Sequence, residues 1–143
     1  MTKATVLCVG HAVQDYVFSV ADLPRLAVKH QASALLRVGG GPAATAAVAV
    51  ARLGGRALLA ARVGDDAVAG EMVAELESWG VDCAHVRRLA GHCSSLSAVM
   101  LDRRGERMIV NYLDQNMPAA AGWLPAPQAV GADAVLADSR WPE

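Results

Sequence analysis

The apolar positions of this chain fall into short runs that end at glycine or at charged residues. Thr5–Val9 is an apolar, β-branched run that ends at Gly10, and Arg56–Val63 and Ala134–Ala137 are further runs of this kind. Short continuous apolar runs between turn signals are typical of strands that are buried on both faces of a sheet. The pattern therefore predicts a central sheet of buried strands.

Two segments between these runs have helical character. The first begins at Pro42, directly after three glycines, and is expected to end near Leu53, before another pair of glycines. Proline in the first turn and glycine after the last turn are helix-boundary signals. The second, Val68–Trp79, has apolar residues at helical spacing and is followed by Gly80, so it is also expected to be a helix.

Four other segments are predicted to be strands outside the central sheet. They are expected at about residues 12–20, 31–38, 97–101 and 106–113. The last two flank a polar, glycine-containing loop, as the strands of a β-hairpin do. The order of all these elements predicts one layered α/β domain that carries an accessory antiparallel sheet.

The composition narrows the class of protein. The chain has 143 residues, enough for one domain, of which 54% are hydrophobic, and its formal net charge is −1. This charge gives no reason to expect a nucleic-acid or anionic-membrane partner, and the apolar run at 42–51 is too short to span a bilayer. With no recognisable signal peptide and no metal-ligand spacing among Cys8, Cys83 and Cys93, we expect reduced thiols in a cytoplasmic protein.

The sequence Gly39-Gly40-Gly41-Pro42 is the strongest local signal for a ligand site. Backbone without Cβ atoms allows close approach, and the following helix is expected to offer free N–H donors and the positive end of its dipole. The same residues also suit a plain turn from strand to helix. The pattern is neither a dinucleotide-binding GxGxxG nor a P-loop, so the glycines alone leave both interpretations open.

Four polar residues lie near predicted strand ends or in loops. Asp15 follows the first strand, Asn111 lies near the end of a hairpin strand, Arg140 follows the last strand, and Lys29 is in a loop. Ligands of open α/β sheets bind beyond the carboxyl ends of the strands, where a carboxylate can accept hydrogen bonds from a polyol and an arginine can hold an anion. For each of these residues taken alone, an ordinary surface position is a better explanation than a role in ligand binding.

Other polar residues favour structural roles. Asp65 and Asp66 precede the second helix, where an aspartate can cap the N-terminus. The histidines show no triad or metal pattern, so we expect surface or core positions for them and no metal site. They are His11, His30, His85 and His92.

In combination, these segments resemble the N-terminal half of the ribokinase/PfkB family of carbohydrate kinases. The resemblance is carried by Gly10-x4-Asp15, GGGPAATAAVAVARLG at 39–54, RVGDD at 62–66 with Gly70, and LESWGV at 76–81. These motifs occur in the family's order and cover nearly the whole chain. They imply a ribokinase-like, Rossmann-type layered sheet with an accessory β-lid over the sugar, and a homodimer formed through that lid in the full-length protein.

Within the family, the chain looks most like the sulfofructose kinases, which phosphorylate 6-deoxy-6-sulfofructose at its 1-hydroxyl. The segments GGGPAATAA, GERMIVNY at 105–112 and ADSRW at 137–141 carry this similarity. In that branch a Lys, an Asn and an Arg bind the sulfonate, and Lys29, Asn111 and Arg140 stand at the matching positions. Thr45 stands where the family usually has a sugar-binding Asn. The resemblance implies a substrate site made of Asp15, Lys29, Gly39, Gly40, Gly41, Thr45, Asn111 and Arg140.

The family's catalytic residues belong to its other half. They are an Asp in a Gly-Ala-Gly-Asp motif that acts as base, and the glycines beside it; no such motif precedes Glu143. We therefore expect a kinase that uses ATP and Mg²⁺ when complete, and a chain that binds neither and is inactive alone. Two alternatives stay open: a kinase for another sugar or a nucleoside, and a noncatalytic sugar-binding or dimerisation module.

Overall fold

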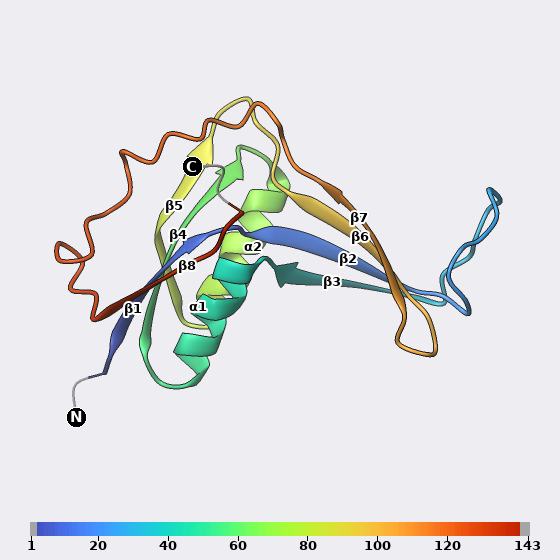
Figure 1. Cartoon of the computed structure of the whole chain (residues 1–143), viewed down its shortest axis with the longest axis horizontal. Helices are drawn as coiled ribbons and strands as arrows, with labels where there is room; N and C mark the ends of the chain where they lie inside the picture. The colour runs from blue at the N-terminus through green and yellow to red at the C-terminus, as the bar shows by residue number, and fades with distance from the viewer. Residues whose placement is uncertain (1–2, 141–143) are drawn as a thin grey trace.

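The computed structural model describes residues 3–140, which form a parallel sheet covered by two helices and a second sheet that projects from it (Figure 1). The elements in chain order are β1 (Thr5–Gly10), β2 (Val13–Ser19), β3 (Ala34–Gly40), α1 (Pro42–Arg52), β4 (Arg56–Gly64), α2 (Ala67–Ser78), β5 (Val81–Leu89), β6 (Leu96–Leu101), β7 (Arg107–Tyr112) and β8 (Ala134–Ala137). The predicted α/β class with an accessory sheet is confirmed. Trp141, the last residue of the ADSRW segment, lies outside the described residues.

The first sheet has the strand order β5-β4-β1-β8, and all its strands are parallel. Successive residues of a strand point to opposite faces. On one face, Cys8 and Leu59 pack against the alanines of α1. On the other face, Leu7 and Leu58 pack against Trp123, which belongs to the long connection between β7 and β8. Both faces are therefore covered, as the continuous apolar runs predict.

The helices begin and end within one residue of their predicted bounds. Pro42 is the first residue of α1, and Gly54, just past its end, has a φ of 88° that an L-residue rarely adopts. Asp66 caps α2 by accepting a hydrogen bond from the N–H of Ala69 at 2.9 Å, which confirms a structural role for this aspartate. Among residues 3–140, neither helix has the length and apolarity needed to cross a membrane.

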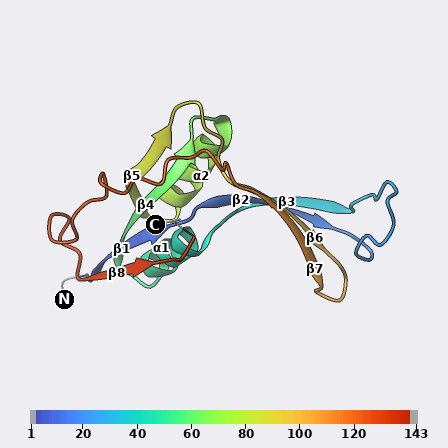
Figure 2. The ribbon, with the colours of Figure 1, turned by 45° about the horizontal axis from the view of Figure 1, so that its top comes forward.

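The second sheet, which we call the lid, has the order β3-β2-β6-β7 and extends away from the first sheet (Figure 2). The outer pairs, β2–β3 and β6–β7, are antiparallel as predicted. The central pair, β2–β6, is parallel, so the expectation of a purely antiparallel sheet is wrong. The reason is that β2 continues from β1 and β6 follows β5, so both strands leave the first sheet in the same direction.

The glycines differ most from the prediction. A strand was expected over residues 31–38 with a three-glycine turn after it, but β3 runs from Ala34 to Gly40. Gly39 pairs with Gln14 and Gly40 with Val13 in the lid ladder. Only Gly41, with a φ of 95°, forms the turn into α1. This pairing is with a distant strand, so the local sequence pattern does not reveal it.

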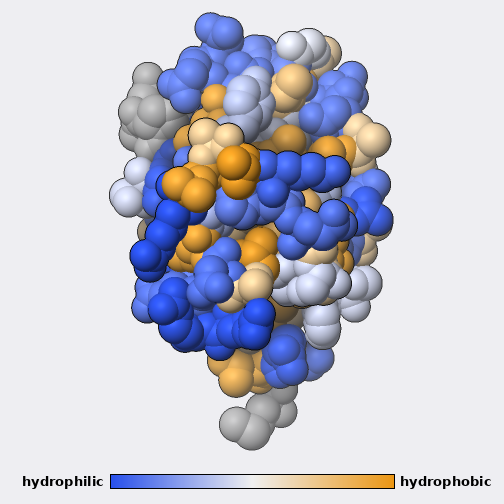
Figure 3. Space-filling model, turned by 90° about the vertical axis from the view of Figure 1, so that its right-hand side faces the viewer, coloured by the Kyte–Doolittle hydropathy of each residue, from blue (hydrophilic) through white to orange (hydrophobic). Residues whose placement is uncertain are grey.

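The lid exposes apolar side chains, some of which appear as orange areas in the polar surface at the lid end of the molecule (Figure 3). β7 is exposed along its whole length. The large exposed apolar residues of the lid strands are Leu35, Leu36, Leu101, Met108, Ile109, Val110 and Tyr112. A sheet that exposes so much apolar surface is typical of an interaction site.

The three cysteines are free thiols. Cys8 and Cys83 are buried and Cys93 is exposed. Burial, with Glu77 and Asp82 nearby, raises the pKa of Cys83 to about 11, so this thiol stays protonated near neutral pH.

Candidate functional site

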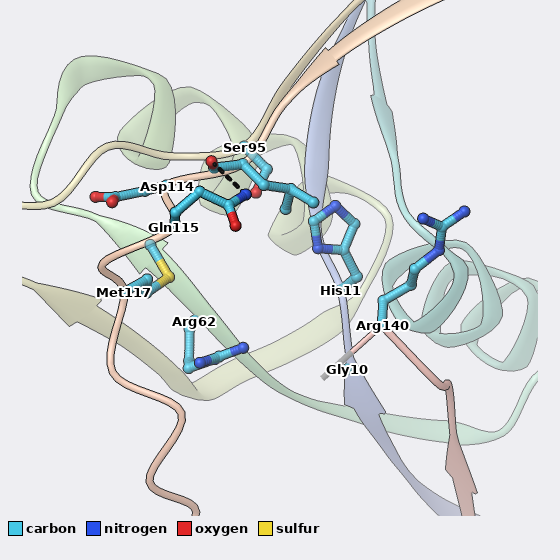
Figure 4. Close-up of a pocket in the computed structure, with 9 residues that line it drawn as sticks. Gly10, His11, Arg62, Ser95, Asp114, Gln115, Met117 and Arg140 are labelled. Carbon is cyan, nitrogen blue, oxygen red and sulfur yellow. Dashed lines mark hydrogen bonds between the residues drawn. The ribbon is translucent and has the colours of Figure 1, made fainter. Parts of the chain in front are cut away.

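Polar side chains gather where the carboxyl ends of β1, β4 and β8 meet. Because the three strands are parallel neighbours, their carboxyl ends share one edge, the edge at which open α/β sheets bind ligands. A cavity of about 220 Å³ opens there (Figure 4). Its walls are formed by Gly10, His11, Arg62, Ser95, Leu113, Asp114, Gln115, Met117 and Arg140.

The lining of this cavity contains two guanidinium groups, from Arg62 and Arg140, against the single carboxylate of Asp114. His11 adds no charge near neutral pH, because burial lowers the pKa of its imidazole. Arg140 and Arg62 lower that pKa further, whereas Asp138 and Asp15 oppose them. The carbonyl oxygen of Pro118 accepts a hydrogen bond from Nη1 of Arg62 and so fixes its guanidinium.

Asp114 is held in place by three hydrogen bonds. Its carboxylate accepts from the N–H of Asn116 at 2.9 Å, from the N–H of Cys93 at 3.2 Å, and contacts Nδ1 of His92 at 3.0 Å. These bonds lower the pKa of Asp114, which stays ionised. Asp114 was not predicted from the sequence, because two of its three partners, His92 and Cys93, lie in a different loop.

Asp138 links three segments around the same edge. Its Oδ2 accepts from the N–H groups of His11 at 2.8 Å and Ala43 at 3.1 Å, and its Oδ1 accepts from the N–H of Arg140 at 2.9 Å. It also lies where a side chain at Gly10 would be, since an added Cβ would be 2.4 Å from its carboxylate. Asp138 was not predicted as a site residue from the sequence.

The first turn of α1 does not offer the free N–H donors that were predicted from the sequence. The N–H of Ala43 donates to Asp138, that of Ala44 to the carbonyl of His11 at 3.4 Å, and that of Thr45 to the carbonyl of Gly41 at 2.9 Å. Pro42 has no N–H. The positive end of this helix is therefore neutralised by a carboxylate of the chain itself.

Asp15 and Asn111 lie in one row across the lid. Asp15 pairs with Ser97 and Ser97 with Asn111, so the side chains of this row share one face of the sheet. The carboxylate of Asp15 lies over Gly40, where an added Cβ would be 2.4 Å from its Oδ2. The glycine is thus needed for the carboxylate to lie beside the start of α1.

The other sequence candidates near the glycines are placed differently. The N–H of Gly39 donates to Oε2 of Glu75 on α2 at 3.0 Å. Thr45 is exposed and lines a separate cavity between α1, α2 and β3, together with Val38 and Trp79. The structure therefore does not place Thr45 in the cavity that contains Arg140.

Lys29 is the candidate farthest from the others in the fold. It is exposed in the connection between β2 and β3, which Figure 1 and Figure 2 both show at the far end of the lid. Arg140 follows β8, beside the first sheet. The described chain does not bring these two cations together.

The arrangement offers hydrogen-bonding groups for hydroxyls on the lid and guanidinium groups for an anion in the cavity. Within the part of the chain described, no three His, Cys, Asp or Glu side chains are grouped so that they could hold a metal ion. The fold and site together define an α/β domain with a projecting β-lid and a polar cavity at the carboxyl edge of its first sheet. More specifically, the chain belongs to the pfkB family of carbohydrate kinases, whose sequence profile matches residues 3–136.

The known proteins that the chain resembles support this family assignment. The chain is 37% identical over 107 residues to fructokinase-1 of Oryza sativa subsp. japonica, covering 75% of the chain and 32% of the relative. It is 26% identical over 102 residues to a deoxyribokinase of Salmonella typhi, covering 71% and 33%. A crystal structure of a ribokinase-type protein from Agrobacterium tumefaciens is 39% identical with a TM-score of 0.90, covering 99% of the chain and 46% of that structure.

Arabidopsis thaliana ribokinase, solved with ribose and ATP, is 25% identical with a TM-score of 0.75, over 98% of the chain and 46% of that structure. The ribokinase-like fold inferred from the motifs is thus confirmed. The chain spans about a third of the length of the curated relatives it matches.

Proposed function

We propose that the chain forms the acceptor-binding side of an ATP-dependent carbohydrate kinase whose acceptor carries an anionic group. The observation that supports this most directly is the cavity at the carboxyl edge of the first sheet, which is lined by two arginines, Arg62 and Arg140, and by one carboxylate, Asp114. A neutral sugar does not need two guanidinium groups, whereas a sulfonate or phosphate matches their forked donors.

The acceptor that we propose is 6-deoxy-6-sulfofructose, phosphorylated at its 1-hydroxyl. Asp15 and the backbone of Gly40 and Gly41 bind the sugar hydroxyls, and Asn111 and Arg140 bind the sulfonate. Asp15 and Asn111 lie in one row of the lid, which supports a shared ligand. The resemblance to the sulfofructose kinases supports the choice of sulfonate over other anions.

Three residues of the substrate site implied by the resemblance do not contact the proposed acceptor directly in this arrangement. Lys29 reaches this acceptor only if the lid changes position or if the lid of a second copy supplies it. Gly39 already donates its N–H to Glu75, so its contribution is to hold the end of β3 that leads into the turn at Gly41. Thr45 lines the cavity between α1, α2 and β3, so it contacts the acceptor only if the acceptor extends past Gly41 into that cavity.

ATP is the proposed phosphoryl donor, with Mg²⁺ as its counterion. Relatives solved with nucleotides support this: the Arabidopsis ribokinase with ATP, and a ribokinase of Cryptococcus neoformans var. grubii with ADP. ATP supplies the phosphoryl group, while the residues described here orient the acceptor and limit its access to water. We place this kinase in the cytoplasm, where free thiols such as those of the chain persist.

The experiment is a coupled assay of ATP consumption by the complete protein with sulfofructose, fructose 6-phosphate and fructose. We expect kcat/KM for sulfofructose to exceed the other two values by roughly 100-fold, because only it matches both the charge and the hydroxyl pattern. A preference for fructose 6-phosphate would contradict the sulfonate assignment and leave the kinase class standing. No ATP consumption with any sugar would contradict both.

We also propose that the protein forms a homodimer through the lid. The lid exposes apolar residues on both of its outer strands, among them Leu36 on β3 and Ile109 on β7, which lie in one row across the sheet. Identical apolar surfaces that bury each other form a twofold interface. Analytical ultracentrifugation of Ile109→Glu tests this: we expect a monomer, and a dimer as stable as that of the unchanged protein would contradict the proposal.

A further inference from the structure

Two carboxylates of helix α2 hold strand β3 of the lid. Oε2 of Glu71 accepts from Nη1 of Arg37 at 2.9 Å, and Oε2 of Glu75 accepts from the backbone N–H of Gly39 at 3.0 Å. Residues four apart share a helix face and rise about 6 Å, and residues two apart share a strand face and rise about 6.7 Å. The spacing of the two carboxylates therefore matches the spacing of their two partners on β3.

The two contacts differ in kind. The Arg37–Glu71 ion pair joins side chains that are 58% and 50% exposed, where solvent screens the charges. Glu75 instead binds the backbone of β3 itself, at the outer edge of the lid, since β3 pairs only with β2 among the described strands. A side chain at Gly39 would press on this carboxylate, because an added Cβ would be 3.3 Å from Oε2.

Apolar packing does little to fix β3 at this point. A cavity of about 200 Å³ lies between α1, α2 and β3, lined by Val38, Thr45, Leu76 and Trp79 beside Glu75. Trp79 at this cavity is 48% exposed, so the apolar side chains here do not close tightly over β3. Besides its ladder with β2, β3 is therefore held against α2 by the polar contacts.

Gly39 is followed directly in the chain by residues of the candidate acceptor site. The next residue, Gly40, leaves the space that the carboxylate of Asp15 occupies, and Gly41 makes the turn into α1. A shift of Gly39 shifts Gly40, and with it the surroundings of Asp15. Glu75 itself does not line the cavity that contains Arg140.

We propose that Glu75 is a positioning residue for the acceptor site, acting through Gly39 to hold the glycine turn and the lid in their binding position. The kinetic effect of this inference rests on the proposed kinase function. The contact between Glu75 and Gly39 can itself be tested without an activity assay. Glu71 has a minor part, because its partner is an exposed side chain rather than the backbone.

The test compares Glu75→Ala, Glu75→Gln and Glu71→Gln in the complete protein. We expect Glu75→Ala to raise the KM for the acceptor sugar roughly tenfold, with the KM for ATP changed by less than about twofold, because a misplaced turn affects only the acceptor. Glu75→Gln should restore most of the affinity, since its amide oxygen can accept the same hydrogen bond. Glu71→Gln should resemble the unchanged protein. Equal changes in both KM values, or no rescue by glutamine, would overturn the inference.

A second measurement separates this inference from the proposed function. Amide hydrogen exchange of Gly39–Gly41 should become faster in Glu75→Ala than in Glu75→Gln, while the exchange of β4 stays the same. If the unchanged protein phosphorylates no sugar, the proposed function fails, and the exchange result still decides whether Glu75 holds the turn. Equal exchange at Gly39 in all variants would overturn the inference.

Discussion

The carboxylate of Asp138 accepts a hydrogen bond from the backbone N–H of Ala43 at 3.1 Å, in the first turn of α1. The same carboxylate binds the N–H groups of His11 and Arg140. One side chain thus joins the ends of β1 and β8 to the start of α1. It also supplies the negative charge that the helix dipole favours at this end.

Replacement of Asp138 by Ala is expected to lower the free energy of unfolding by about 3 kcal/mol, because three backbone N–H groups lose a charged acceptor. Chemical denaturation measures this directly. Asp138→Asn keeps one side-chain oxygen and should cost less than half as much. A loss below about 0.5 kcal/mol for Asp138→Ala would show that water replaces the carboxylate without penalty.

Gly40→Ala should weaken acceptor binding more than it weakens the fold. Gly40 has no positive φ, so alanine adds no backbone strain, but its Cβ would be 2.4 Å from Oδ2 of Asp15. The Asp15 carboxylate must move, and we expect the KM for the acceptor to rise by roughly tenfold or more. Gly122→Ala is the control, since a Cβ there meets nothing within 4 Å. An unchanged acceptor KM in Gly40→Ala would exclude Asp15 as a ligand.

The stability of the domain should depend on pH through Asp66. Partial burial raises the pKa of this carboxyl, but hydrogen bonds from the backbone and hydroxyl of Ser94 and from the N–H of Ala69 outweigh that effect and lower the pKa overall. A lowered folded-state pKa contributes stability that is present above the ordinary value of 3.8 and is lost as the pH falls through the folded value.

Asp66→Asn is therefore expected to cost about 1 kcal/mol near pH 7 and progressively less in acid, below the ordinary carboxyl pKa. Urea denaturation of both proteins across this pH range measures the difference. Asp65→Asn, at the exposed neighbouring position, should cost little at any pH. A difference for Asp66→Asn that stays constant down to low pH would contradict the role of the ionised carboxylate.

Most of the fold could be predicted because its signals are local. Pro42 and Gly54 mark the ends of α1, and Asp66 and Gly80 mark those of α2. The direction of β6 relative to β2 could not be predicted, since it depends on how both strands leave the first sheet. The inclusion of Gly39 and Gly40 in β3 likewise depends on pairing with β2, which a glycine run does not encode.

The candidate site was predictable only in part, for the same reason. Asp15 and Asn111 were identified from strand ends, and the lid register then places them in one row. Asp138 and Asp114 were missed because their partners, such as His11 and Cys93, are distant in sequence. Lys29 was chosen by resemblance, and its position at the end of the lid depends on a long connection without a strong local signal.

The central claim is that Arg140 binds an anionic group of the acceptor. The most direct measurement is kcat/KM of Arg140→Lys for sulfofructose and for fructose, with Arg107→Lys, an exposed position on β7, as the matched control. Lysine keeps the charge and loses the fork, so we predict a fall of roughly tenfold to a hundredfold for sulfofructose and a change within about twofold for fructose. Equal falls for both sugars, or no fall for sulfofructose, would contradict the account.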